Sequence, residues 1–148
     1  MEMKGEQLIP LPQEATWAAL NDTAVLKDCI PGCESIEQVG ENQYAIVMIA
    51  KVGPVNAKFN GKMTLRDVDP PRAYTLVFEG QGGVAGFAKG EATVALSPQD
   101  AGTKLEYTAK ASIGGKLAQV GARLVDGVAR KIAGQFFDAF NKRVSSKA

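Results

Sequence analysis

Few side chains in this sequence could perform acid–base or nucleophilic chemistry at neutral pH. The 148 residues contain no histidine, which removes the commonest general base, and no serine or cysteine stands in a recognisable nucleophile motif. Glu79, Glu91 and Glu106 fall on expected strands, in phases that face solvent, where glutamate usually lies. We therefore predict no catalytic residues and a protein that is not an enzyme.

Two cysteines, Cys29 and Cys33, are separated by Ile-Pro-Gly. A structural zinc site needs four ligands, and two thiols without any histidine cannot supply them. A reversible disulfide is conceivable, but small buried cysteines in a reducing compartment are usually free thiols. The sequence thus predicts no metal site and no cofactor, and it favours two reduced cysteines.

The three tyrosines offer a different chemistry. Tyr44, Tyr74 and Tyr107 each join an apolar ring to a hydroxyl that could orient a ligand inside an apolar cavity. Each could equally be an ordinary core residue. We take all three as candidates for lining such a cavity.

Composition and charge limit the possible partners. The chain is 45% hydrophobic and 22% charged, and its 17 basic and 16 acidic residues leave a net charge of +1, so we expect one globular domain over residues 1–148 and no nucleic-acid partner. The basic residues Lys142, Arg143 and Lys147 are expected to complement a helix dipole. Residues 1–10 are charged and too short for a secretory leader, so we expect a cytoplasmic protein.

The candidate residues must be positioned by one long C-terminal helix. An apolar stripe with spacings of three and four predicts a helix over residues 114–144, about 45 Å long. Gly121, Gly127 and Gly134 lie inside it, and they either pack closely on a neighbour or leave room for a ligand. The stripe consists of Leu117, Val120, Leu124, Val128, Ile132, Phe136, Phe140 and Val144.

Strands and two short helices precede this long helix. The first strand, residues 3–9, is followed by a helix after Pro12 with Trp17 and Leu20 on its apolar side, and by a second helix that Pro31 and Gly32 terminate. Alternating apolar residues between turn residues then predict six further strands. They cover residues 36–39, 44–51, 55–68, 74–79, 88–97 and 103–113.

This order predicts an α+β fold in which an antiparallel sheet wraps around the long helix. The later strands carry small residues in their buried phase, where a filled core would carry larger ones, so either the helix packs very close or a cavity remains. These residues are Gly80, Gly90, Ala92, Ala109 and Ala111. The glycine-rich residues 81–87 form either a mobile lid or an ordinary hairpin loop.

Several short motifs together resemble one known family. They are IPGCES at 30–35, VGPV at 52–55 followed by KF at 58–59 and Gly61, DPP at 69–71, GGKLAQ at 114–119, and the pair Phe136-Phe137. Over nearly the whole chain, the sequence resembles the CoxG family of carbon monoxide dehydrogenase subunits. The resemblance implies the helix-grip fold of the START/Bet v 1-like (SRPBCC) superfamily, a curved antiparallel sheet around a long C-terminal helix, and a deep hydrophobic pocket.

We expect the pocket to be lined by apolar and aromatic side chains. Ile132, Phe136 and Phe140 should form its wall or gate, while residues 117–128 close the core tightly. The full set of expected lining residues is Tyr44, Phe59, Met63, Tyr74, Phe78, Phe87, Tyr107, Leu124, Val128, Ile132, Phe136 and Phe140.

The resemblance also implies a function. Similar proteins are accessory to molybdenum-containing carbon monoxide dehydrogenases and related hydroxylases, in maturation, membrane attachment or electron delivery, and a lipid- or quinone-like ligand would suit the pocket. Longer relatives carry a hydrophobic C-terminal anchor, whereas this sequence ends at Ala148, so we expect membrane contact to be at most peripheral. Two alternatives are a START-like cyclase or dehydratase and a maturation chaperone without a ligand.

Overall fold

The computed structural model describes residues 1–145, and its elements follow the expected order of strand, two short helices, six strands and long helix. In chain order they are β1 (Glu2–Ile9), α1 (Gln13–Leu20), α2 (Thr23–Cys29), β2 (Cys33–Gly40), β3 (Gln43–Val52), β4 (Val55–Asp69), β5 (Ala73–Gln81), the 3-10 turn η1 (Gly83–Ala85), β6 (Phe87–Gln99), β7 (Gly102–Gly114), α3 (Lys116–Gln119) and α4 (Ala122–Ser145). All seven expected strands and both short helices are confirmed.

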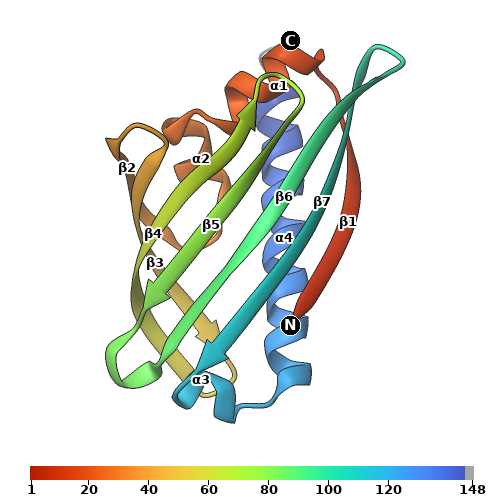
Figure 1. Ribbon diagram of the computed structural model, residues 1–148. Coiled ribbons are helices and arrows are strands. Elements are labelled where there is room, and N and C mark those ends of the chain that lie inside the picture. The colour runs from red at the N-terminus through yellow and green to blue at the C-terminus, as the bar shows by residue number, and fades with distance from the viewer. Residues whose placement is uncertain (146–148) are drawn as a thin grey trace.

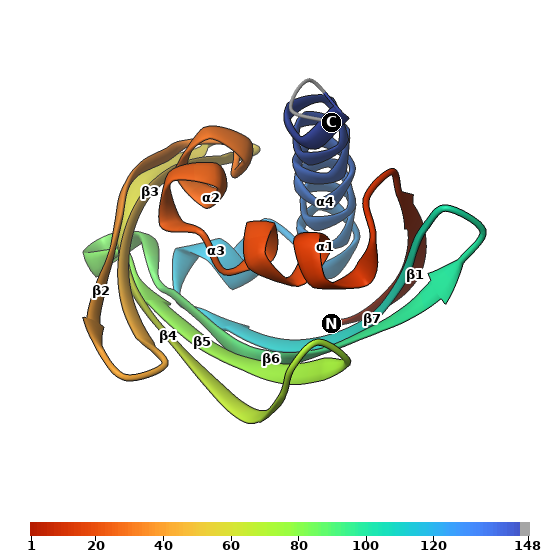
Figure 2. The same cartoon turned by 90° about the horizontal axis from the view of Figure 1, so that it is seen from above.

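The strands form one antiparallel sheet in the order β1-β7-β6-β5-β4-β3-β2. The first strand pairs with the last, so β1 and β2 are the two edges, and α1 and α2 lead the chain from one edge to the other (Figure 1). The sheet is bent into a trough, and α4 lies over its concave side together with α1 and α2 (Figure 2). This is the predicted helix-grip arrangement.

Alternating burial along β4 shows why these residues form a two-sided sheet. Every second residue from Val55 to Leu65 is partly buried, and the residues between them are exposed. Because successive side chains of a strand point to opposite faces, one face of β4 lines the trough and the other meets solvent.

The short helices are fixed by local hydrogen bonds. The carboxylate of Asp22 accepts from the backbone N–H of Ala24 at 2.9 Å and so caps α2. Thr16 on α1 is fully buried beside Thr103 of β7, whose hydroxyl donates to the Leu11 carbonyl at 2.7 Å. These bonds join the start of α1 to the end of the sheet at which β7 begins.

The C-terminal region differs from the prediction, because it forms two helices instead of one. Gly121 lies between α3 and α4 with a φ of +98°, a conformation that ends one helix and that glycine adopts at little cost. Gly127 and Gly134 are exposed on the outer face of α4, and a Cβ at either would meet no neighbour. These two glycines therefore neither pack closely nor leave room inside the trough.

Within residues 1–145, no helix combines the length and the hydropathy needed to cross a bilayer. Near the end of α4, Arg143 forms an ion pair with Asp28 of α2, so this basic residue ties two elements together. Lys147, the last of the three C-terminal basic residues, lies outside the described residues.

Candidate ligand-binding cavity

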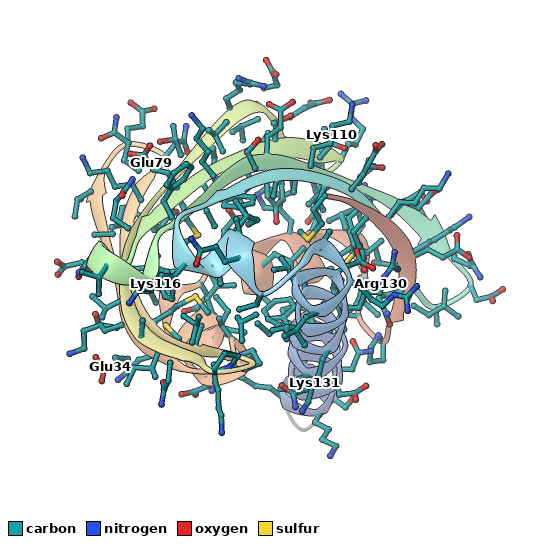
Figure 3. All side chains as sticks on the ribbon, turned by 90° about the horizontal axis from the view of Figure 1, so that it is seen from below. Glu34, Glu79, Lys110, Lys116, Arg130 and Lys131 are labelled. Atoms are coloured by element: carbon teal, nitrogen blue, oxygen red, sulfur yellow. The ribbon has the colours of Figure 1, made fainter. Side chains whose placement is uncertain are left out.

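A cavity of about 550 Å³ lies between the concave face of the sheet and α4. Its floor comes mainly from β3 to β7, its roof from α4, and its two ends from α1–α2 and from α3. Figure 3 shows the side chains that project into the trough from the sheet and from α4. The volume falls within the range of about 300–1,000 Å³ that is usual for small-molecule sites.

Small residues on the floor explain why this space is open. Gly80, Ala92, Ala109 and Ala111 all line the cavity. Gly90 lies in the same cross-strand row, paired with Phe78 on one side and with Ala111 on the other. Of the two possibilities that the sequence left open, the structure shows space in place of close helix packing.

Nine of the twelve residues that we expected to line the pocket do so. They come from four strands and from α4, and they are Tyr44, Phe59, Met63, Tyr74, Phe78, Tyr107, Val128, Ile132 and Phe136.

The prediction for Phe87 was wrong because the strand phase places it on the outer face. The next residue, Ala88, lines the cavity, and neighbouring residues of a strand point to opposite faces. The Phe87 ring instead covers its partner Gly114, and the ammonium group of Lys89 lies 5.9 Å from the ring centroid.

Leu124 and Phe140 also lie outside the cavity. Leu124 is 39% exposed and lies against Gly53 in the turn between β3 and β4, while its neighbour Val125 is buried and lines the cavity. Phe140 has no exposed surface and belongs to a buried cluster with Ile9 and Leu105, of which Leu105 also borders the cavity. The expected roles of the helical region are thus partly reversed, since Leu117, Val125 and Val128 line the cavity and Phe140 closes the core.

Sequence reasoning missed several lining residues. Two groups share a simple signal: they continue the inward phase of β3 after Tyr44, or they follow the buried face of α4. The first group is Ile46, Met48, Ala50 and Val52, and the second is Val125, Ala129, Ala133 and Phe137. Met1 and Met3 line the cavity from β1, where the alternation was too weak to identify an inward face.

The polar groups on the cavity wall are few and uncharged. Among residues 1–145, the polar side chains at inward-facing positions of the lining are the three tyrosines, with their hydroxyls, and Asn21. Burial raises the pKa of Tyr74 well above its usual range, and nearby Tyr44 raises it further, so the phenol stays protonated at neutral pH and can donate a hydrogen bond. Glu79, Glu91 and Glu106 are exposed, as predicted, and Glu79 points away from the trough (Figure 3).

The glycine-rich loop between β5 and β6 is a hydrogen-bonded turn at the α3 end of the cavity. The N–H of Gly82 donates to the Gly86 carbonyl at 2.8 Å, and Ala85 is buried. Gly86, at a φ of +110°, packs its backbone directly against Gly114 and Gly115. The sequence left a mobile lid and an ordinary hairpin loop both open, and this packing is that of an ordered loop.

The two cysteines are both free thiols in this structure, Cys29 buried and Cys33 half-buried. In the described part of the chain, no three histidine, cysteine or acidic residues come together as they would at a metal site. Burial raises the pKa of each thiol above its ordinary value.

The fold and cavity define a class of protein. A curved antiparallel sheet, a long C-terminal helix across it and an apolar cavity between them make a Bet v 1-like, helix-grip protein. The chain belongs to the CoxG family of carbon monoxide dehydrogenase subunits, whose sequence model matches residues 5–145. No curated protein sequence matches the chain.

Several solved structures share this fold. The chain is 33% identical to a conserved protein from Geobacillus kaustophilus, with a TM-score of 0.92 over 99% of this chain and 96% of that one. The aromatase/cyclase Zhui from Streptomyces sp. R1128 is 15% identical, with a TM-score of 0.70 over 98% and 93% of the two chains. Ara h 8.0201 is 17% identical, with a TM-score of 0.66 over 99% and 98%. The last two similarities show the fold alone.

Proposed function

We propose that this protein carries a hydrophobic, lipid- or quinone-like molecule and does so as a non-enzymatic accessory to a molybdenum-containing carbon monoxide dehydrogenase or a related hydroxylase. The observation that carries the proposal is the cavity of about 550 Å³ with its floor of glycine and alanine. The apolar side chains around this cavity make fewer van der Waals contacts than they would in a filled core. An apolar ligand in the cavity would supply the missing contacts. Membership of the CoxG family supports the link to the enzyme.

The direct test is to identify what the purified protein contains. Native mass spectrometry and solvent extraction should reveal a bound hydrophobic molecule, and the stripped protein should bind decylubiquinone and N-phenyl-1-naphthylamine in titrations. A variant with a filled cavity, Ala109→Phe, is the matched control, because the added ring would occupy the floor. If no molecule co-purifies and neither probe binds, the carrier function is wrong.

A second candidate is an enzyme of the cyclase kind, favoured by the fold shared with the Zhui aromatase/cyclase and by the buried tyrosines. Such chemistry needs an acid–base pair inside the cavity. The inward-facing lining of residues 1–145 supplies phenol and amide groups, which are weak acids and bases at neutral pH. Turnover of a poly-β-ketone by the purified protein, lost in Tyr74→Phe, would favour the enzyme over the carrier.

A third candidate, the maturation chaperone without a ligand, makes a different prediction in cells. Deleting the gene of a carrier should leave an assembled dehydrogenase that fails to pass electrons to its acceptor. Deleting the gene of a chaperone should leave the enzyme unassembled, without its molybdenum centre. Measuring metal content and dye-linked activity of the enzyme in the deletion strain separates the two.

A further inference from the structure

Two buried tyrosines in the cavity have hydroxyls without a protein partner. Tyr44 is 9% exposed and Tyr74 is 8% exposed, and both line the cavity. Neither hydroxyl makes a hydrogen bond to any of residues 1–145. Within residues 1–145 neither hydroxyl is a fully enclosed unpaired atom, so both remain accessible from the cavity, and an acceptor inside it can reach these two donors.

Both tyrosines lie at the end of the cavity that α1 and α2 cover. The Tyr74 ring meets Trp17 of α1 edge-on, with centroids 5.2 Å apart. Tyr44 packs in a cluster flanked by Leu26 and Ile30, which belong to the α2 region. Tyr44 pairs with Met63 of β4, which pairs with Phe78 of β5, so Tyr44 and Tyr74 lie four residues apart along the strands with β4 between them. Both residues line the cavity, and the Tyr44 phenol is near enough to raise the pKa of Tyr74.

The opposite end of the cavity is wholly apolar. There Val52, Leu117 and Val125 form a buried cluster, with Phe59 and Val128 packed against it. The charged residues whose backbone borders the cavity, Lys62 and Glu79, are exposed and lie on the outer phase of their strands. The cavity therefore has one end with hydroxyl donors, one end without polar side chains, and no inward-pointing charged side chain among the described residues; the N-terminal ammonium of Met1, at the β1 edge, donates to the Ala111 carbonyl.

We propose that the hydroxyls of Tyr44 and Tyr74 form the polar end of the ligand site, and that the ligand is an uncharged molecule with a carbonyl-type oxygen at one end of an apolar body. This inference rests on the proposed function. The ligand oxygen accepts hydrogen bonds beneath α1 and α2, and the apolar body extends toward α3. A carboxylate or phosphate at this end is disfavoured, because its charge would lose its water without meeting a cationic side chain.

Tyr107 provides a comparison inside the same cavity. Its ring is stacked on Phe137, with centroids 5.6 Å apart, and its hydroxyl fills the space above Gly5 of β1, where an added Cβ would lie 2.8 Å from the oxygen. Through Val94 of β6, Tyr107 lies in the same cross-strand row as Tyr74, but its hydroxyl is directed to the β1 side. Removing it should change the affinity for polar and apolar ligands by the same factor.

The experiment uses the full-length protein, stripped of bound molecules, and three matched probes: 2-tridecanone labelled with ¹³C at its carbonyl, tridecane and dodecanoate. We expect the ketone to bind more tightly than dodecanoate at neutral pH, and its carbonyl stretch to fall below the value in hexane because it accepts hydrogen bonds. Tyr44→Phe and Tyr74→Phe should each weaken ketone binding about three- to tenfold relative to tridecane and move the stretch back toward the hexane value. In Tyr107→Phe the ratio of ketone to tridecane affinity should stay constant.

The outcomes separate this inference from the function on which it rests. If tridecane and the ketone bind but neither tyrosine variant changes their ratio, or if dodecanoate binds more tightly than the ketone, the tyrosine site is wrong and the carrier function stands. If no probe binds the folded wild-type protein, both are wrong. Circular dichroism of each variant checks folding, and the carbonyl stretch in the wild-type protein gives a reading that needs no variant.

Discussion

The two halves of α4 carry similar apolar residues but face opposite environments. Toward its C-terminus, Phe140 and Val144 are buried among large side chains such as Ile9 and Leu105. Toward its N-terminus, α4 faces the cavity, across which the sheet presents alanine and glycine. We call these regions the packed end and the hollow end. The apolar stripe of a helix therefore does not by itself determine whether the space beside the helix is filled. The size of the residues on the facing strands and helices determines it.

The short helices account for much of this difference. Leu20 of α1 and Val25 and Cys29 of α2 enter the cluster around Phe140, and the ion pair between Arg143 and Asp28 joins α4 to α2 at the surface. At the hollow end, α3 contributes only Leu117 to the buried cluster. Since empty volume lowers stability, the packed end must supply much of the stability that the hollow end lacks.

The largest expected effect is at Phe140. Phe140→Ala would leave a void in a fully packed region, and we expect a loss of about 3–5 kcal/mol in the free energy of unfolding. The matched variant is Phe136→Ala, one turn earlier, which borders the existing cavity and should cost less than half as much. Urea denaturation of both variants measures the difference. Equal losses would show that the two ends are not distinct in packing.

The second prediction concerns substitutions that enlarge a side chain, one on the cavity floor and one in the packed end. Ala111→Leu on the cavity floor should leave stability unchanged or slightly raised, because the side chain enters empty space, while ligand affinity falls by about tenfold or more, which corresponds to about 1.4 kcal/mol. Ala139→Leu, against the packed cluster, should cost about 1–3 kcal/mol by overpacking. A large loss of stability in Ala111→Leu would contradict the hollow end. Thermal unfolding and probe titration measure both effects.

Much of this contrast could be predicted from sequence where periodicity was strong. Alternation between turn residues located the strands, weakly for β1 and clearly for β4. The small inward residues on β5 to β7 left close helix packing and a cavity both open, and the structure has a cavity there. Phe87 was misassigned because its strand begins at that residue, so the alternation that decides its face was not extended to it.

The two errors on the C-terminal helix, at Leu124 and at Phe140, have different causes. Residues of a helix turn by about 100° each, so an inward face counted from Leu117 holds only if the helix is continuous. The break at Gly121 resets this phase, and Val125 turns inward in place of Leu124. The burial of Phe140 depends on α1 and α2, which are remote in sequence, and spacing within the helix carries no information about them.

The third prediction concerns that break. Gly121→Ala places a side chain at a φ of +98°, and we expect a loss of about 1–2 kcal/mol. Gly127→Ala is the control, because this glycine is exposed within α4 and an added Cβ meets no neighbour, so alanine should raise stability by about 0.5–1 kcal/mol. Opposite signs for the two substitutions would confirm the break. A gain in both would show that α3 and α4 can join into one helix, as the stripe predicted.

The smallest effect is a difference in reaction rate between the two thiols. Burial raises the pKa of Cys29 and of Cys33, so both are protonated at neutral pH, and alkylation should speed up as the pH rises above the ordinary thiol pKa. Half-buried Cys33 should react in the folded protein, whereas Cys29, 3% exposed in the packed cluster, should react only when that end opens.

Iodoacetamide labelling followed by peptide mass spectrometry measures the two rates. Phe140→Leu, a milder change than Phe140→Ala, should accelerate labelling of Cys29 and leave Cys33 unchanged, because it weakens only the cluster that covers Cys29. If both thiols accelerate together, the packed end opens as one unit with the cluster around Tyr44, against which Cys33 packs. If Cys29 alone responds, the packed end has its own local stability, and a ligand that binds at the hollow end can come and go without unfolding it.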